Sequence, residues 1–310
     1  MLSRPHRLSR FLAAALAAAL LAATPASAQP PPEGKLKVVA SFSILADLVK
    51  NVGGERVDVA ALVGPNGNAH VYAPSPADAK RLADARIVFV NGLGFEGWLD
   101  RLVKASATTA PIVVASRGVK PLARAEARAH AGDRGSLDPH AWQSVANAEL
   151  YVANIRDALI AVDPAGKGAY AAQAGAYLGK LDALDREVRE AIARIPPERR
   201  RVISSHDAFG YFAAAYGITF IAPQGVSTEA EASARDVAAI ISDVRKRKAP
   251  AVFLENVTDP RLAEQIARET GVKLGGVLYS DALTGAAGAA PTYIDLMRHN
   301  LRQLAAALTS

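Results

Sequence analysis

Residues 163–195 read DPAGKGAYAAQAGAYLGKLDALDREVREAIARI, and this stretch decides how the rest of the chain is organised. Apolar side chains recur in it at alternating steps of four and three, which places them on one stripe of a helix. They are Tyr170, Ala174, Tyr177, Leu181, Leu184, Val188, Ala191 and Ile195. Asp163-Pro164 is typical of a helix start, and Pro196-Pro197 stops the helix. At about 1.5 Å per residue, a helix from Pro164 to Ile195 is about 48 Å long.

The other face of this helix carries acid-before-base pairs spaced four residues apart, which is the favourable order on a solvated surface. They are Asp182/Arg186, Asp185/Arg189 and Glu190/Arg194. Gly175 and Gly179 each weaken the helix by about 1 kcal/mol relative to alanine, so packing must hold its first half together. A coiled coil is the alternative, but the repeat is short for one. We therefore expect a linking backbone helix, within residues 163–197, that packs along a globular protein.

The N-terminal residues have the pattern of a secretory signal peptide. Arg4, Arg7 and Arg10 precede an apolar run over residues 11–23, and Ala26-Ser27-Ala28 is a small-residue cleavage site. The apolar run is shorter than the ~20 residues that span a bilayer, so a membrane anchor is disfavoured. We expect residues 1–28 to be removed during export to the periplasm.

Composition narrows the class of protein. The chain has no cysteine, which excludes disulfides, thiolate metal ligands, cysteine nucleophiles and a lipid-modified N-terminal cysteine. Half of its residues are apolar, enough for one large or two ordinary domains. Three arginines among residues 1–28 account for half of the formal charge of +6, so nothing requires nucleic acid as a partner. We expect a soluble, monomeric, exported protein.

Short apolar runs alternate with helical patterns on both sides of the central helix. This alternation predicts an α/β fold of two lobes, each with a mainly parallel sheet flanked by helices, over residues 29–162 and 198–310. The expected strands are 36–40, 57–63, 87–90, 112–115, 202–205, 218–222, 251–254 and 272–279. The expected helices are 44–52, 76–85, 98–105, 209–216, 234–247, 261–270 and one from Pro291. Ser75 and Asp78 predict a cap at the start of the second of these helices.

Four side chains outside the central helix have metal-binding chemistry. His70 lies in a glycine-rich loop after a predicted strand, His140 follows a polar loop, and His206 and Asp281 each follow a predicted strand directly. Ligands bind at the carboxyl ends of strands in open α/β sheets, and three imidazoles with one carboxylate suit Zn²⁺. Separations between 66 and 75 residues carry no local signature. On spacing alone, ordinary surface histidines remain the alternative.

Five segments, taken together, resemble the periplasmic zinc/manganese-binding proteins of ABC transporters, the TroA-like solute-binding family. They are NAHVYAPSP (68–76), NGLGFEGWL (91–99), DPHAW (138–142), SHDAFGYF (205–212) and YSDAL (279–283). They occur in the family's order and cover nearly all of the chain after residue 28. The resemblance implies two lobes joined by a rigid helix, a metal ion held between them, and an ABC-transporter permease as partner. It also implies that His70, His140, His206 and Asp281 are the ligands.

The resemblance also bears on the identity of the metal. Manganese-selective members usually have glutamate at the position of His206. Together with segments 225–236 and 253–260, the three-histidine set is most similar to the AztC-type zinc binders. A nitrogen-rich set of ligands also favours Zn²⁺ chemically, so we expect zinc import, with manganese or iron as the alternatives. Glu255, at a strand end, is either a hydrogen-bond partner of a ligand imidazole or an ordinary solvated carboxylate.

Residues 122–136, LARAEARAHAGDRGS, have no apolar pattern and predict a mobile loop placed as a gate before His140. Zinc-specific members of the family often carry a histidine-rich loop here, whereas this chain has only His130. We expect His130 either to accept zinc from a donor such as a periplasmic metallochaperone or to be a solvated surface histidine.

Two enzymatic alternatives remain on the sequence alone. Residues 92–97, GLGFEG, match the G-x-G-x-x-G pattern of dinucleotide-binding loops, with Arg117 placed for a 2′-phosphate, but Glu96 would lie beside the pyrophosphate. A zinc hydrolase would use the three histidines, a metal-bound water and Asp281 as base. A receptor without catalytic activity is the preferred hypothesis, because four protein ligands leave no open coordination position.

Overall fold

The computed structural model describes residues 34–123, 137–247 and 250–309. The expected signal peptide, His130 and nearly all of the expected gate loop lie outside these ranges. Within them, no helix has both the length and the apolar character needed to span a membrane.

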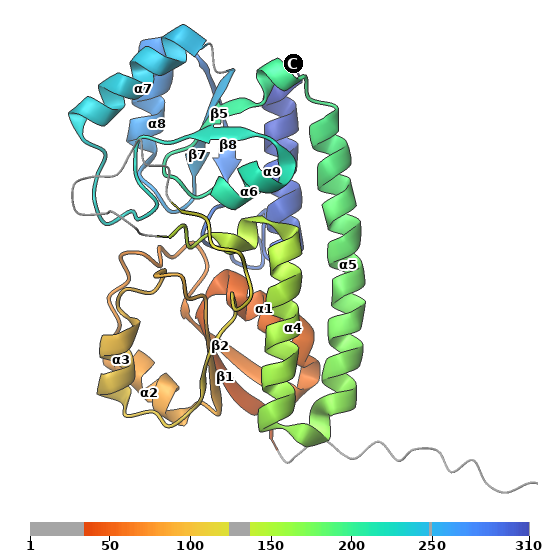
Figure 1. Cartoon of the computed structure of the whole chain (residues 1–310). Coiled ribbons are helices and arrows are strands. Elements are labelled where there is room, and N and C mark those ends of the chain that lie inside the picture. Colours follow the sequence, from red (N-terminus) through yellow and green to blue (C-terminus); the bar gives the residue numbers. More distant parts are fainter. Residues whose placement is uncertain (1–33, 124–136, 248–249, 310) are drawn as a thin grey trace, which may run out of the picture.

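Two four-stranded sheets form the two lobes, and every strand pair in them is parallel (Figure 1). The first sheet has the order β2-β1-β3-β4 and the second the order β6-β5-β7-β8. The strands are β1 Leu36–Phe42, β2 Val57–Val63, β3 Ile87–Val90, β4 Ile112–Val114, β5 Arg201–Ile203, β6 Thr219–Ile221, β7 Ala251–Glu255 and β8 Lys273–Leu278. The predicted α/β fold with two mainly parallel lobes is confirmed.

Helices connect successive strands within each lobe, as parallel pairing requires. They are α1 Ser43–Gly53, α2 Pro76–Asp84, α3 Leu99–Ser106, α6 Gly210–Tyr216, α7 Ala234–Arg247 and α8 Pro260–Thr270. The predicted cap of α2 is a complete capping box. Its Ser75 N–H and hydroxyl donate to Asp78 Oδ2 at 2.8 and 2.7 Å, and the Asp78 N–H donates back to Ser75 Oγ.

The central helix is α5, Lys167–Ala193, and its predicted apolar stripe is buried from Tyr170 to Val188. Its start differs from the prediction, because residues 164–166 form a turn of 3₁₀ helix and Asp163 makes no cap. Instead, the Asp163 carboxylate accepts hydrogen bonds from the Arg56 guanidinium at 2.9 and 3.0 Å and from the Tyr170 hydroxyl at 2.7 Å. Of the predicted surface pairs, Asp185 and Arg189 meet at 2.6 Å.

Two further long helices stand beside α5. These are α4, Val145–Val162, which the sequence analysis does not identify, and the C-terminal α9, Tyr293–Leu308. Helix α5 contacts α1 and α4 on the side of the first lobe and α6 and α9 on the side of the second (Figure 1). It therefore spans both lobes rather than only leading from one to the other.

The main hydrophobic core is continuous between the lobes. One cluster of buried side chains extends from the first sheet through α4, α5 and α9 to Val202 and Phe253 of the second sheet. A smaller cluster covers the opposite face of the second sheet and includes Ile203, Ile221 and Ile266. The lobes therefore share packing that fixes one against the other.

Candidate metal centre

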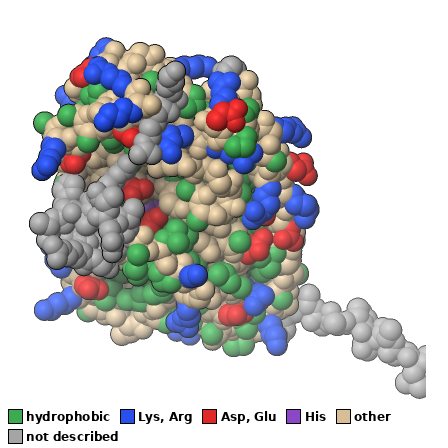
Figure 2. Space-filling view, turned by 45° about the horizontal axis from the view of Figure 1, so that its top comes forward, with side chains coloured by type: hydrophobic (Ala, Val, Ile, Leu, Met, Phe, Trp, Pro, Cys, Tyr) green, Lys and Arg blue, Asp and Glu red, His purple; other side chains and the backbone are tan. Residues whose placement is uncertain are grey.

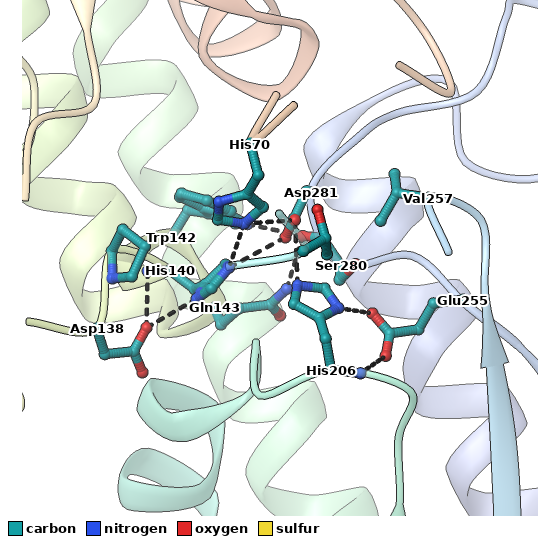
Figure 3. A network of polar contacts seen from close by, with 12 residues as sticks. His70, Asp138, His140, Trp142, Gln143, His206, Glu255, Val257, Ser280 and Asp281 are labelled. Carbon is teal, nitrogen blue, oxygen red and sulfur yellow. Dashed lines mark hydrogen bonds and ion pairs between the residues drawn. The ribbon is translucent and has the colours of Figure 1, made fainter. Parts of the chain in front are cut away.

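His70, His140, His206 and Asp281 converge between the two lobes, with their side chains pointing toward one another (Figure 3). His70 lies between β2 and α2, and His140 precedes a short 3₁₀ turn over Ala141–Gln143. His206 and Asp281 follow β5 and β8. One potential ligand atom from each lies within 4.8 Å of the others, and all four residues are buried. The structure thus brings together the four residues that the sequence analysis selected.

The distances within the cluster suit a single small cation. The Nε2 atoms of His70 and His206 each lie 3.2 Å from Asp281 Oδ2, and His140 Nε2 lies 3.5 Å from Asp281 Oδ1. The Nε2 atoms of His70 and His140 are 3.3 Å apart. A tetrahedron with metal–ligand bonds of about 2.0–2.1 Å has edges of about 3.3 Å. The four side chains therefore have the separations of ligands around one tetrahedral ion.

Carboxylates lie behind two of the imidazoles. Asp138 Oδ1 is 2.8 Å from His140 Nδ1 and also accepts the His140 backbone N–H at 2.9 Å. Glu255 Oε2 is 2.7 Å from His206 Nδ1, while its Oε1 accepts the backbone N–H groups of Ser205 and His206 at 2.7 and 2.9 Å. A carboxylate at Nδ1 fixes the ring and keeps the proton there, which leaves Nε2 free for a metal.

The same contacts replace pairing with β7 after Ile203, where β5 ends earlier than the sequence analysis places it, while the Ser204 N–H still donates to the Ile221 carbonyl at 3.0 Å on the β6 side. The N–H groups of Ser205 and His206 donate to the Glu255 side chain rather than to a neighbouring strand. Asp138 is a functional residue that the sequence analysis missed. The sequence does contain a signal for Asp138, because it is an acidic residue two positions before the candidate ligand His140. At that spacing its carboxylate can reach both the ring and the backbone N–H of His140.

Aromatic rings enclose the centre on the side of the first lobe. The Phe95 ring lies edge-on to His70, with centroids 4.9 Å apart, and Trp142 lies 5.3 Å from His140. Trp98 Nε1 donates to the carbonyl of Ala69 at 2.8 Å and so holds the loop that carries His70. These rings keep water away from the imidazoles and limit the positions that the imidazoles can take.

Burial and neighbouring charges act in opposite directions on the pKa values of the four clustered side chains. Burial lowers the pKa of His140, but Asp281 and Asp138 outweigh burial and raise this pKa to about 9. Burial also opposes the positive form of His206, but Glu255 and Asp281 raise its pKa well above the ordinary value. For His70 burial dominates, and its pKa is lowered. Burial acts to raise the pKa of Asp281, but His206 and His140 hold it well below the usual range.

The cluster also contains unmet bonding capacity. Among the described residues, neither carboxylate oxygen of Asp281 makes a hydrogen bond of normal geometry, and the same holds for both ring nitrogens of His206 and for Glu255 Oε2, although Glu255 Oε2 and His206 Nδ1 lie 2.7 Å apart. The two Asp281 oxygens and His206 Nε2 are buried and face the point where the side chains converge. A cation at that point would replace both the protons and the missing hydrogen bonds.

The G-x-G-x-x-G segment is used structurally and does not offer a phosphate site. The buried Glu96 carboxylate accepts hydrogen bonds from the Ser41 hydroxyl at 2.6 Å and from the N–H groups of Asn91 and Gly92 at 2.6 and 3.1 Å. Burial raises the pKa of Glu96. The N–H groups that would hold a pyrophosphate are therefore occupied by the chain's own carboxylate, and the nucleotide alternative fails.

Comparison with known proteins agrees with this arrangement. Residues 38–307 match the family model described as zinc-uptake complex component A, periplasmic. The chain is 35% identical over 271 residues to the iron-binding protein YfeA of Yersinia pestis, covering 87% of this chain and 86% of that protein. It is also 35% identical over 266 residues to the manganese-binding lipoprotein MntA of Halalkalibacterium halodurans, covering 86% of each.

Solved structures show the same fold. The periplasmic zinc binding protein TroA from Treponema pallidum matches with a TM-score of 0.81 at 31% identity, covering 89% of this chain and 99% of that one. The family consists of solute-binding receptors rather than enzymes, so the hydrolase alternative is set aside. The chain belongs to the family of periplasmic metal-binding proteins that serve ABC transporters as their substrate-binding components.

Proposed function

We propose that this protein captures Zn²⁺ in the cluster of His70, His140, His206 and Asp281 and delivers it to the membrane permease of an ABC transporter. The observation that carries the proposal is the position of the three Nε2 atoms, each 3.2–3.5 Å from a carboxylate oxygen of Asp281. Three imidazoles and one carboxylate form a borderline-soft set of ligands that zinc accepts with tetrahedral geometry.

Manganese or iron is the alternative cargo for the same cluster. Relatives of this chain are named for binding manganese or iron, and both oxygens of Asp281 face the imidazoles. A carboxylate that binds through both oxygens would give five ligand atoms, and the harder ion Mn²⁺ tolerates oxygen-rich, higher-coordinate sites better than zinc does. The similarity to the AztC-type zinc binders remains a prediction.

Export and partnership belong to the same proposal. We infer that residues 1–28 direct the chain to the periplasm and are then removed, and that the mature receptor works as a monomer with a permease and its ATPase. A periplasmic metallochaperone that loads the receptor is an optional addition. The absence of cysteine from the chain supports a mature form without a lipid-modified cysteine.

The decisive experiment measures metal content and affinity together. Protein exported by its own N-terminal residues and purified without added metal is analysed for zinc, manganese and iron, and the metal-free form is titrated with each ion against a chelator. We expect one zinc per chain and tighter binding of zinc than of manganese. Alanine at His70, His140 or His206 should weaken zinc binding at least 100-fold.

A matched control is His299→Ala, because His299 lies outside the cluster with its Nε2 2.9 Å from the Val277 carbonyl. It should leave zinc affinity unchanged. Tighter binding of manganese than of zinc would assign the receptor to manganese. Wild-type affinity in a cluster variant would remove that histidine from the set of ligands.

A further inference from the structure

The Asp281 side chain lacks the support that two other members of the cluster have. The rings of His140 and His206 each lie against a carboxylate, that of Asp138 and that of Glu255. Among the described residues, no hydrogen bond of normal geometry reaches either carboxylate oxygen of Asp281. The aspartate side chain is short, so the position of its oxygens follows closely from the position of its main chain. Whatever fixes the main chain at Asp281 therefore fixes this carboxylate.

Two side chains of the first lobe hold the main chain beside Asp281 (Figure 3). The Ser280 carbonyl accepts a hydrogen bond from Trp142 Nε1 at 2.9 Å and another from Gln143 Nε2 at 2.8 Å. All four of these residues are 0% exposed, and hardly any histidine is visible on the face of the molecule drawn in Figure 2. Water therefore cannot replace either donor.

The far end of the same segment is also bound to the first lobe. The Leu283 N–H donates to Ser43 Oγ at 3.0 Å, and the Leu283 carbonyl accepts the backbone N–H of Asn66 at 2.8 Å. Ser43 is the first residue of α1 and is itself buried. Segment 280–283 is thus fixed to the first lobe at both of its ends.

The second lobe holds the chain mainly at the preceding residue. The Tyr279 N–H donates to Asn300 Oδ1, and the Tyr279 carbonyl accepts from Asn300 Nδ2, both at 2.8 Å. Beyond Tyr279, Asn256 Nδ2 donates to the Ala282 carbonyl at a longer distance of 3.3 Å. Although segment 280–283 follows β8 in the sequence, its shorter hydrogen bonds are those to the first lobe.

A short turn joins this anchor to a second member of the cluster. Gln143 is the last residue of the 3₁₀ turn that follows His140, and its N–H donates to the His140 carbonyl at 3.1 Å. The backbone of Gln143 therefore closes the turn beside His140, while its side chain holds Ser280. The distance of 3.5 Å between His140 Nε2 and Asp281 Oδ1 is set across these few bonded groups.

Stability alone does not explain a glutamine at this position. Gln143 Oε1 is buried and has no hydrogen-bond partner among the described residues, and a buried oxygen without a partner is unfavourable. With an apolar residue in place of Gln143, the Ser280 carbonyl would keep Trp142 as a donor. The second donor is therefore not needed to pair this carbonyl, but it does restrict the direction in which the carbonyl points.

From these contacts we propose that Gln143 and Ser43 are positioning residues for Asp281, one at each end of the segment that carries it. Three of the four clustered side chains then belong to one rigid unit on the first lobe, and His206 is the one that the second lobe supplies. The inference rests on the proposed function, because it concerns how a ligand of the proposed metal ion is held.

Gln143→Met tests the inference, because methionine is also long and unbranched but has no N–H donor. Zinc affinity, measured by competition with a chelator, should fall about tenfold, as it does when a group that supports a metal ligand is removed. The denaturant midpoint of the metal-free protein should not fall, because the unpaired oxygen is removed as well. Cobalt(II) serves as a spectroscopic probe, since its visible absorption is strong in a tetrahedral site and weak at higher coordination numbers. The variant should lose part of this absorption.

Ser43→Ala is the second variant, and it loosens the other end of the segment. It removes the acceptor of the Leu283 N–H and should lower zinc affinity by about fivefold, the weight of one ordinary hydrogen bond. Asn154→Leu is the matched control, because it removes an amide that donates to the carbonyls of Ala115 and Arg117, outside the cluster. The control should keep the wild-type zinc affinity and cobalt spectrum, even if it unfolds more readily.

Hydrogen exchange in the metal-free protein provides a readout that does not depend on metal binding. The amides of residues 279–284 should exchange faster in Gln143→Met and Ser43→Ala than in the wild type and Asn154→Leu. Wild-type affinity, cobalt spectrum and exchange in both Gln143→Met and Ser43→Ala, or equal losses in Asn154→Leu, would overturn the inference. A wild type that binds no zinc would instead overturn the proposed function, whereas faster exchange in the two variants would still support their role in holding Asp281.

Discussion

His206 Nδ1 lies 2.7 Å from Oε2 of Glu255, and Oε1 of the same carboxylate accepts the backbone N–H of His206. One glutamate therefore fixes both the ring and the main chain of this histidine. Both residues are buried, at 0% and 4% exposure, so water cannot replace either contact. The orientation of the His206 ring depends on a residue 49 positions away in the sequence.

Glu255→Gln should weaken zinc binding about 10- to 100-fold, the usual effect of removing a carboxylate that supports a metal-bound histidine. The amide cannot accept at both the ring and the backbone N–H groups. Competition titration against a chelator measures the change. Glu264→Gln, on the surface of α8, is the matched control and should be neutral. If both variants bind alike, Glu255 has no part in positioning His206.

Zinc affinity should fall as pH falls. His140 has a pKa of about 9 in the metal-free cluster, and the pKa of His206 is raised well above its ordinary value. Protons therefore compete with the metal over the whole range below pH 9, and the dissociation constant should rise up to about tenfold per pH unit for each proton displaced. Titrations at pH 6, 7 and 8 give the slope, and calorimetry in buffers of different ionisation enthalpy counts the protons released. A flat profile would show that the imidazoles do not bind the metal.

His206→Glu should shift the preference of the site from zinc toward manganese. The change replaces a borderline nitrogen by a second carboxylate, and manganese favours such a harder set of ligands. Direct competition between the two ions, read as metal content after dialysis, gives the ratio. If zinc is still preferred by the same factor, the geometry of the remaining ligands sets selectivity.

Zinc should stabilise the folded protein, because the unfolded chain cannot assemble four side chains so distant in sequence. At a free concentration 100 times the dissociation constant, the expected gain in the free energy of unfolding is about 2.7 kcal/mol. Thermal melts with increasing zinc measure it, and His140→Ala should lose most of the shift. A wild-type melting temperature that ignores zinc would contradict the assignment of the site.

Asp47→Asn should stabilise the metal-free protein at neutral pH. Burial raises the pKa of Asp47 from 3.8 to about 6, although its Oδ2 accepts the Tyr293 N–H at 2.9 Å. A raised carboxyl pKa means that this group lowers the free energy of unfolding as pH rises from about 4 to 6. Part of the side chain reaches solvent, so we expect the asparagine variant to have a free energy of unfolding about 1–2 kcal/mol higher than the wild type at pH 7. Denaturant unfolding at pH 4 and pH 7 should show a gain only at pH 7, whereas Asp58→Asn, on the exposed face of β2, should show none.

The sequence predicts α5 well because its buried stripe from Tyr170 to Val188 has unbroken helical spacing. Helix α4 escapes prediction because its pattern is mixed. Leu150 is 40% exposed, and the Asn154 side chain donates to the carbonyls of Ala115 and Arg117 instead of facing solvent. Leu150 is apolar but lies outside the buried face of α4, and Asn154 is polar but has partners in the tertiary structure. Together they hide the helical spacing of apolar residues that a prediction from sequence relies on.

For the site, the sequence supplies the four clustered residues but only part of their surroundings. Segments such as DPHAW and YSDAL are recognisable as local patterns, so His140 and Asp281 can be selected in advance. The pairing of Glu255 with His206 depends on β7 lying beside β5, which no local pattern encodes. For the same reason, Asp163 looks like a helix cap, although its carboxylate accepts hydrogen bonds from Tyr170 and from Arg56, the latter 107 residues away.

The shared hydrophobic core has a consequence for how a transporter tells a full receptor from an empty one. Separating the lobes enough to expose even about 400 Å² of apolar surface would cost about 10 kcal/mol, as much as a typical domain's whole stability. The empty and loaded receptors therefore have nearly the same outline, and X-ray scattering curves recorded with and without zinc should superimpose. The permease must distinguish them by short-range features near the metal centre, such as the contact between Asn68 and Thr228 that joins the two lobes, and not by overall shape.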